Sequence, residues 1–506
     1  MTCFSSPWRN SAARSETYFR LTYIYILLIH YSLSRVKWKR DQPEHDLMGT
    51  IDIPKPSAPS TEANSPFTWV LEGLGSHARE YGGTFATEFT VLACQLLTYK
   101  LAAHFLGKTG FSEYAVARRT ISLIYPLPLL GMAVALPRYV AHAIGGGNGD
   151  RKERYFGAAV WCMGLGLLTC VLLMNLFPGV FAYFFFAGRE YANLVPPLSA
   201  LLVGLVLHTL VYSYLRGCLA MRRANLLQLI NYGIVPLTAF ALFSSSLRSV
   251  LLAMGILATV AASVALILTP IHRAAERVMP EAKELLNYGL QRVPGDFSQM
   301  ALFTLPTVIV AHVDGIQTAG SVAFGISVVG MIASVFSPVG LVLLPKASWM
   351  LAAGASREIA LHVRQIGWVT VLFSLSITFL LAIFAPSLIA LFLGPGFGHV
   401  TASVRVLVWG AVPFSVYYVL RGIIDAFHQS GINTRNLIFA LLSLVAIAGG
   451  AKFIGKSVSA AVSISFLASL YFLALLTLYE TRKIIVRIQA EQTRGAVDRI
   501  EAPFVS

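Results

Sequence analysis

Charged side chains are scarce in this sequence. Only 12% of its 506 residues are Asp, Glu, Lys or Arg, whereas 56% are hydrophobic, and the mean hydropathy is +0.68. A soluble globular domain carries about 25% charged residues, so this shortage excludes an ordinary soluble fold. We therefore expect an all-α chain that crosses a bilayer many times.

Signatures of catalysis and of metal binding are also missing. The five cysteines are an odd number and include no C-x-x-C pair, which argues against a disulfide framework or a zinc site. The glycine-rich stretch GGGNGD at 145–150 lacks the G-x-x-x-x-G-K-[ST] pattern of a phosphate loop and is typical of a turn. No H-E-x-x-H or G-x-S-x-G motif occurs. We expect no enzyme activity, no metal and no cofactor.

The net charge of +15 points to cytoplasmic loops and not to nucleic acid as a partner. Basic residues collect after every second apolar segment, as in DRKERY at 150–155 and MRRAN at 221–225, and this bias places both ends of the transmembrane body in the cytoplasm. Each segment is long enough to cross a hydrocarbon core, which takes about 20 helical residues. We predict twelve helices, near 83–105, 113–143, 155–177, 194–217, 226–246, 249–271, 293–312, 321–345, 366–387, 402–424, 436–454 and 457–479.

Residues 1–80 differ from the rest of the chain. They hold one short apolar run, YIYILLIHYSL, which is brief for a spanning helix and is followed by the basic cluster RVKWKR. Met48 then opens a polar segment that looks like a normal cytoplasmic start. Two interpretations stay open: the first 47 residues belong to the protein, or its true start is Met48.

The two halves of the chain repeat each other at a shift of 208 residues. AHFLG at 103–107 corresponds to AHVDG at 311–315, EFT at 88–90 to DFS at 296–298, and LPR at 136–138 to LPK at 344–346. Such matches in one order are hard to obtain by chance. The repeated His104 and His312 are better explained as helix-end packing residues than as ligands.

The repeat divides the chain into four parts. Residues 1–80 form an N-terminal extension, 81–275 and 276–480 form two six-helix lobes, and 481–506 form a cytoplasmic tail. An even number of helices per copy makes the repeat parallel, an arrangement in which transporters place a substrate between two rocking lobes. A duplicated scaffold without a substrate is the alternative.

Acidic and polar residues form a stripe on one helix of each lobe. At roughly 100° per residue, Gln95 and Tyr99 each lie within about 20° of Glu88. Asp296 and Thr307 share the spacing of Glu88 and Tyr99, so both stripes are predicted to face one cavity. Charges inside a bilayer are costly and usually face such a cavity. The two acids either exchange an ion during transport or balance nearby arginines, and both roles stay open.

Basic side chains form the second intramembrane set. Guanidinium groups suit an anionic phosphate because they present several donors in one plane. The alternative is that these residues extend toward the membrane surface and determine the membrane topology of the chain. This alternative stays open for Arg216. It is favoured for Arg421, which can pair with Asp425. The candidates for a substrate anion are Arg118, Arg119, Arg138, Arg216, Arg292 and Lys346.

The motifs LPRYVAHAIGGGNGD at 136–150 and LPKASWMLAAG at 344–354, with Gly-x-x-x-aromatic openings at 110–114 and 320–324, carry a family resemblance. The chain resembles the Wzx-type oligosaccharide flippases, in the superfamily that also holds the MATE drug exporters and the MurJ-like lipid II flippases. The resemblance implies a V-shaped pair of six-helix lobes. It also implies that the chain flips undecaprenyl-diphosphate-linked oligosaccharides across a bacterial inner membrane, for capsule, O-antigen or exopolysaccharide synthesis.

The same resemblance implies partners and site residues. Lipid-linked oligosaccharide and membrane lipid are the expected ligands, with a polysaccharide polymerase and export machinery as protein partners. Helices one, two, seven and eight border a cationic cavity in such proteins. All the basic candidates except Arg216 lie on these helices, so the resemblance implies that the other five contact the diphosphate. The lobes are not equivalent, because the 208 shift places the uncharged Ile326 and Ser327 opposite Arg118 and Arg119.

Two other functions compete with flipping. A MATE-like antiporter of small cations has the same helices, but the positive intramembrane set argues against a cationic substrate. A membrane glycan polymerase or ligase usually needs a large external loop, and the longest external connection, FAGREYANLVPP at 186–197, offers little room.

Overall fold

A computed structural model describes residues 78–146, 149–269, 278–336, 339, 356–427, 431–451 and 458–501. This part of the chain is helical throughout. Residues 1–77 of the extension predicted at 1–80, the segment of the second LP-basic motif and Lys346 lie outside the described residues. Ten helices in the described part are long and apolar enough to cross a membrane.

The first half of the chain forms α3 to α11. Several predicted spans are built from two pieces, because proline, glycine or a π-helical turn interrupts them. The elements are α3 (Ala78–Ile124), α4 (Pro126–Leu129), α5 (Met132–Gly145), α6 (Gly149–Leu176), α7 (Pro178–Phe186), η2 (Arg189–Leu194), α8 (Val195–Gly217), α9 (Met221–Leu229), η3 (Ile230–Ile234), α10 (Val235–Phe243) and α11 (Leu247–Ile267).

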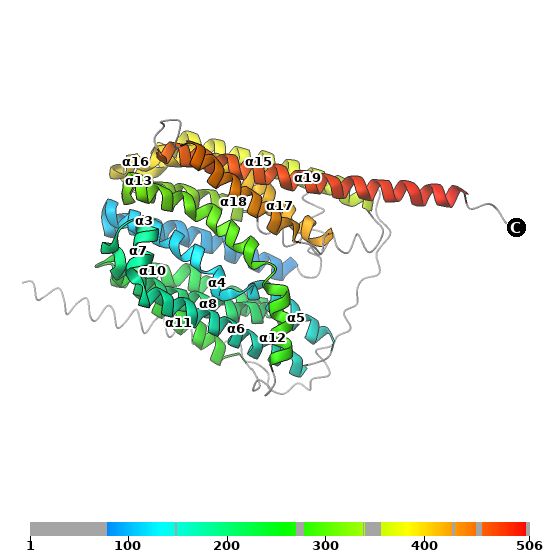
Figure 1. The fold of residues 1–506 in the computed structure, drawn as a ribbon, viewed down its shortest axis with the longest axis horizontal. Coiled ribbons are helices and arrows are strands. Elements are labelled where there is room, and N and C mark those ends of the chain that lie inside the picture. The colour runs from blue at the N-terminus through cyan, green and yellow to red at the C-terminus, as the bar shows by residue number, and fades with distance from the viewer. Residues whose placement is uncertain are drawn as a thin grey trace, which may run out of the picture. The chain divides into compact units, whose positions relative to one another are not determined.

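The second half begins with a short helix and continues to the end of the described chain. Its last helix extends well past the predicted start of the tail at 481. The elements are α12 (Met279–Gly289), α13 (Val293–Ser334), α15 (Ser356–Phe392), η4 (Pro395–Phe397), α16 (Gly398–Leu407), η5 (Val408–Gly410), α17 (Ala411–Phe427), α18 (Ile432–Ala451) and α19 (Val458–Glu501). Figure 1 shows α5, α6, α8, α10 and α11 gathered in one group and α15 to α19 in another.

The long helices α3 and α13 each turn back at a glycine, which reconciles ten spans with twelve predicted crossings. Gly107 has φ 65° and ψ −167°, and Gly315 has φ 81° and ψ 170°. The chain doubles back there, because the rings of Tyr99 and Tyr114, fifteen positions apart, lie 5.6 Å from each other. The two glycines are 208 positions apart, so the repeat predicted from the sequence is confirmed in the backbone.

The second predicted helix, 113–143, is not continuous. Leu130 and Gly131 have positive φ angles of 49° and 76°, and they separate α4 from α5. Gly131 is required there because a Cβ atom would lie 2.2 Å from the carbonyl oxygen of Gly289 at the end of α12. This backbone contact joins the connecting helix α12 to the first lobe.

We expect Gly107→Ala to lower the thermal unfolding midpoint of the purified protein in detergent. The φ and ψ of Gly107 fall in a region that is essentially open to glycine alone, where a side chain costs about 1–3 kcal/mol. No atom lies within 4 Å of a Cβ at Gly107, so a loss of stability would come from backbone strain and not from a clash. Gly164→Ala is the matched control, since Gly164 lies inside α6 with equally open space. Equal midpoints for the two variants would show that the turn stores no strain.

Candidate functional site

A cavity of about 280 Å³ lies where α3 meets α13, with α9 and η3 closing one side. Its lining is mainly polar and contains two arginines and one glutamate, which gives the described wall a net positive charge. The polar lining consists of Glu88, Gln95, Arg118, Arg119, Ser122, Gln228, Tyr232, Ser327 and Ser334. We call this space the arginine cavity.

Arg119 extends from the first lobe to the second. Its Nη2 donates to the hydroxyl of Ser327 at 2.6 Å, and Nε and Nη2 both lie 3.4 Å from the carbonyl oxygen of Ala323. Ser327 is the position that the 208 shift pairs with Arg119, so the two residues meet near the axis that relates the repeats. The Arg119 guanidinium therefore lines the arginine cavity and also hydrogen-bonds to α13.

Arg118 and Tyr99 stack beside that contact. The Arg118 guanidinium carbon lies 5.2 Å from the centre of the Tyr99 ring, a cation–π distance. The Tyr99 ring is 1% exposed, and its hydroxyl is 2.8 Å from that of Ser327. Tyr99 lies on the predicted polar stripe, but it packs between the lobes and does not line the arginine cavity.

Glu88 and Gln95 do line the cavity, as one stripe of α3. The charge of Arg216 on α8 acts on Glu88, and the Arg216 guanidinium carbon lies 5.6 Å from the ring centre of Tyr212. Arg216 is absent from the cavity wall. Its position fits the interpretation in which the glutamate and a nearby arginine balance each other.

Arg138 and Arg292 lie elsewhere, at the junction of the lobes. Arg138 of α5 is 4.7 Å from the centre of the Tyr288 ring, and Arg292 is 6.0 Å from the same ring centre. Arg292 also contacts Asp425, with 3.6 Å between Nη2 and Oδ2. The predicted pairing of Asp425 with Arg421 is thus replaced by a pairing with Arg292.

The second predicted stripe does not face the arginine cavity. Asp296 is exposed and lies in the electrostatic surroundings of Arg292 and Arg421, and Thr307 is fully buried with an unpartnered hydroxyl. Neither lines the cavity in the described part of the chain. The expectation of two symmetric stripes around one space is wrong, because α13 rotates its acid toward α17 while α3 rotates its acid inward.

The repeated histidines are packing residues in the structure. His104 is exposed and contacts the ring of Phe105, whereas His312 donates from Nε2 to the carbonyl oxygen of Phe184 at 3.0 Å and contacts the Tyr183 ring. The second contact joins α7 of the first lobe to α13.

A buried polar network behind the cavity escaped the sequence analysis. His208 is 2% exposed; Asn231 donates to its Nδ1 at 3.0 Å, and its Nε2 lies 3.1 Å from Oε1 of Gln228. These bonds hold the imidazole in the neutral Nε2–H form. A second space of about 290 Å³ reaches Asn231 and shares Gln95, Arg118, Ser122 and Tyr232 with the arginine cavity. The polar spacing of Gln228, Asn231 and Tyr232 within an apolar span was the available signal.

An apolar pocket of about 300 Å³ adjoins the arginine cavity. Leu92 of α3 and Met331 of α13 belong to both linings. The far wall comes from α15, where Leu391 is 78% exposed on the outer surface of the helices. The polar space and the apolar space therefore share part of one wall, and the apolar space extends to α15, which is exposed at Leu391.

The two lobes touch at repeat-equivalent positions on the side of the glycine turns. Gln317 donates to the Thr109 hydroxyl at 3.4 Å, and a Cβ at Gly320 would lie 2.3 Å from that of Ser112. Both pairs are 208 positions apart. Residues at an axis of twofold symmetry meet their own counterparts, as in isologous interfaces.

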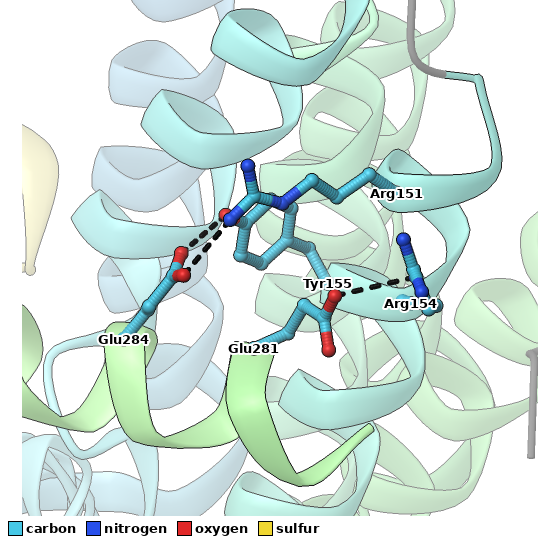
Figure 2. A network of polar contacts seen from close by, with 5 residues as sticks. All are labelled: Arg151, Arg154, Tyr155, Glu281 and Glu284. Atoms are coloured by element: carbon cyan, nitrogen blue, oxygen red, sulfur yellow. Dashed lines mark hydrogen bonds and ion pairs between the residues drawn. The ribbon is translucent and has the colours of Figure 1, made fainter. Parts of the chain in front are cut away.

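The connecting helix α12 is bound to the first lobe by ion pairs (Figure 2). Arg151 donates to Glu284 at 2.8 Å, Tyr155 donates to the same carboxylate, and Arg154 Nε lies 3.2 Å from Glu281, whose side chain is 6% exposed. Loss of Arg154 would be costly because it would leave the buried Glu281 carboxylate without its partner, whereas Arg151 and Glu284 are both partly exposed. These pairs attach α12, which precedes the long helix α13, to α6.

Comparisons with known proteins agree with this arrangement. Residues 84–238 match a family model described as MatE, and no curated protein matches the chain. An inward-facing multidrug resistance MATE family transporter of the MOP superfamily superposes with a TM-score of 0.68 at 14% identity, over 79% of this chain and 96% of that one. An outward-facing one gives 0.62 at 12% identity, over 85% and 98%.

A third similar structure is a MOP superfamily transporter from Pyrococcus furiosus, described as having a binding pocket of reverse polarity that suggests a different function. Its TM-score is 0.61 at 14% identity, over 83% of this chain and 98% of that one. At identities this low, the structural similarity establishes the fold alone. The chain is a multi-pass membrane protein with the two-lobe, twelve-helix fold of the MATE transporters, and much of its first lobe matches the MatE model.

Proposed function

We propose that the protein is a transporter that works by alternating access of its two lobes. Three observations support this: the MATE-type fold, the polar cavity between α3 and α13, and the contact of repeat-equivalent residues of the two lobes along one axis. A duplicated scaffold without a substrate would have no reason to hold two arginines and a glutamate around one cavity, since intramembrane charges are costly.

The structure fits an inward-facing state under this proposal. The lobes contact each other beside the Gly107 and Gly315 turns, through Gln317 with Thr109 and His312 with Phe184, and the distribution of basic residues places these turns on the outer side. The TM-score is also higher for the inward-facing transporter than for the outward-facing one.

The substrate that the site supports best is an anion attached to an apolar chain. The arginine cavity supplies guanidinium groups, hydroxyls and amides, and the adjoining apolar pocket opens toward lipid. This junction is the observation that carries the proposal. A cavity of about 280 Å³ suits a diphosphate head group, while a glycan would need the wider space of an open state.

The finer proposal is a flippase for undecaprenyl-diphosphate-linked oligosaccharides in a bacterial inner membrane, with both ends of the helical body in the cytoplasm. Polysaccharide polymerase and export machinery would then act on the same substrate. A polyprenyl tail can remain in lipid while the charged head passes through the cavity, which removes the main barrier to crossing.

Export of small molecules is the second candidate, and the comparisons favour it. The matching structures include multidrug transporters, and the family model that matches is MatE. Glu88 is the group that a cationic drug or a coupling ion would use, because it is the single carboxylate in the described cavity wall. The two candidates differ in which charged residue of the cavity a substrate needs.

We expect Arg118→Ala and Arg119→Ala to reduce transport more than Arg138→Ala. Loss of a hydrogen bond to a charged group costs about 1.5–3 kcal/mol, or roughly 10–100-fold in affinity, and Arg138 lies outside the described cavity wall. Lys at either position should restore part of the activity. The measurement is the amount of complete lipid-linked glycan left on the inner leaflet in deletion cells that carry each variant at equal abundance. If the Arg118→Ala and Arg119→Ala variants export glycan normally and the deletion strain is sensitive to drugs, the flippase proposal is wrong and drug export is favoured.

We expect Ser327→Ala to loosen the contact between the lobes. The change removes the hydroxyl that accepts from Arg119 and bonds Tyr99, so the outer ends should separate more often. A cysteine placed at Thr109 should then react faster with a water-soluble thiol reagent. Ser321→Ala is the matched control, because Ser321 lies on the same helix and bonds the carbonyl of Gln317 four residues earlier. Equal reactivity in the two backgrounds would contradict a gating role for the Arg119–Ser327 contact.

A further inference from the structure

We propose that the second lobe carries a binding site for an anionic phospholipid, separate from the arginine cavity. The site is a pocket of about 590 Å³ between α15, α17 and α19. We call it the flank pocket. Its walls are apolar, and two arginines, Arg364 and Arg482, lie at its edge.

The floor of the flank pocket belongs to the folded core and is therefore a preformed surface. Val363, Val416 and Leu420 are 2–4% exposed and form one hydrophobic cluster with other residues of α15 and α17. Val371 and Ile485 pack against the same cluster and complete the wall.

The rim of the flank pocket is exposed and apolar. Leu361 is 56% exposed, Trp368 60% and Leu478 47%. Exposed leucine and tryptophan are unfavourable in water, but a hydrocarbon chain would cover them. Tryptophan also collects at the level of lipid head groups, where its ring is apolar and its N–H remains wet.

Arg364 and Arg482 have no carboxylate partner in the described part of the chain. The nearest acid along α19, Glu480, is already paired with Arg435 at 2.5 Å and with Lys483 at 3.9 Å. Both arginines are exposed, so their donors are accessible to a ligand. A guanidinium binds a phosphate oxygen pair with two parallel hydrogen bonds.

The two arginines lie at the same membrane face. Arg364 follows the first residue of the candidate span Val363–Phe392, and Arg482 lies near the end of the span Val458–Arg487. The distribution of basic residues predicts that this is the cytoplasmic face. Basic pockets between transmembrane helices on that side typically bind anionic lipid head groups.

An anionic phospholipid fits these features better than free phosphate. Phosphate alone would use the arginines and leave the apolar floor and the exposed rim uncovered. A phospholipid places its phosphate on the arginines and its acyl chains against Trp368, Leu478 and the floor.

The test uses Trp368 as a reporter. The full-length protein is reconstituted in phosphatidylcholine vesicles that contain a fixed fraction of brominated phosphatidylglycerol or of brominated phosphatidylcholine, and tryptophan fluorescence is recorded. We expect stronger quenching by brominated phosphatidylglycerol, and we expect Trp368→Phe to abolish the difference. Arg364→Ala with Arg482→Ala should weaken the preference by about 30-fold, since each basic residue near an anionic surface contributes about 1 kcal/mol, or roughly fivefold. Arg248→Ala, an exposed arginine on α11, is the control and should keep the preference.

A second variant fills the pocket without removing charge. A Cβ at Gly367 would meet no atom within 4 Å, so Gly367→Leu can occupy the space and exclude lipid, with Gly164→Leu as its control. Equal quenching by the two lipids in the wild type, or an unchanged preference in the arginine or Gly367 variants, overturns the proposal. Displacement of brominated phosphatidylglycerol by inorganic phosphate would identify an anion site instead. None of these readouts depends on transport, so the proposal can fail while the transport function holds, and the reverse.

Discussion

The contact between α3 and α13 at their shared axis is the constraint on which the rest of the structure depends. Three pairs of positions related by the 208 shift meet there: Thr109 with Gln317, Ser112 with Gly320, and Arg119 with Ser327. The approach at Gly320 is so close that any side chain would clash with Ser112. Apolar packing belongs to the same contact, because the ring of Phe324 on α13 lies against the rings of Tyr99 and Phe111 on α3. The arginine cavity lies beside this contact, between the same two helices.

The internal repeat could be predicted from the sequence, and so could most of the first polar stripe. A repeat can be found by comparing the two halves of the sequence directly. The glycines at which α3 and α13 turn recur at the same shift, because only glycine fits those backbone angles. Glu88 and Gln95 line the cavity as their helical spacing suggests. Their roles in transport, and that of the two arginines, stay predictions.

The rest of the site depends on how helices rotate and lean in three dimensions. Spacing along a helix says which residues share a face but not which neighbour covers that face, so Tyr99 lies on the polar stripe and is nevertheless 1% exposed. Asp296 repeats Glu88 in sequence, yet its charged surroundings are Arg292, one turn earlier at the start of α13, and Arg421 of α17. The basic candidates divide for the same reason: Arg118 and Arg119 line the cavity, Arg138 and Arg292 flank Tyr288, and Lys346 lies outside the described residues.

Arg119 links what the cavity holds to how the lobes touch. Its guanidinium has five N–H donors, and those on Nε and Nη2 are directed at Ser327 and Ala323 across the axis. An anion in the cavity would compete for these donors, and a doubly charged phosphate is a stronger acceptor than a hydroxyl or a carbonyl. Binding would then weaken the contact that keeps the outer ends together. Because the same side chain lines the cavity and forms the contact, the substrate itself could favour opening on the far side, and no separate relay through the lobes would be needed.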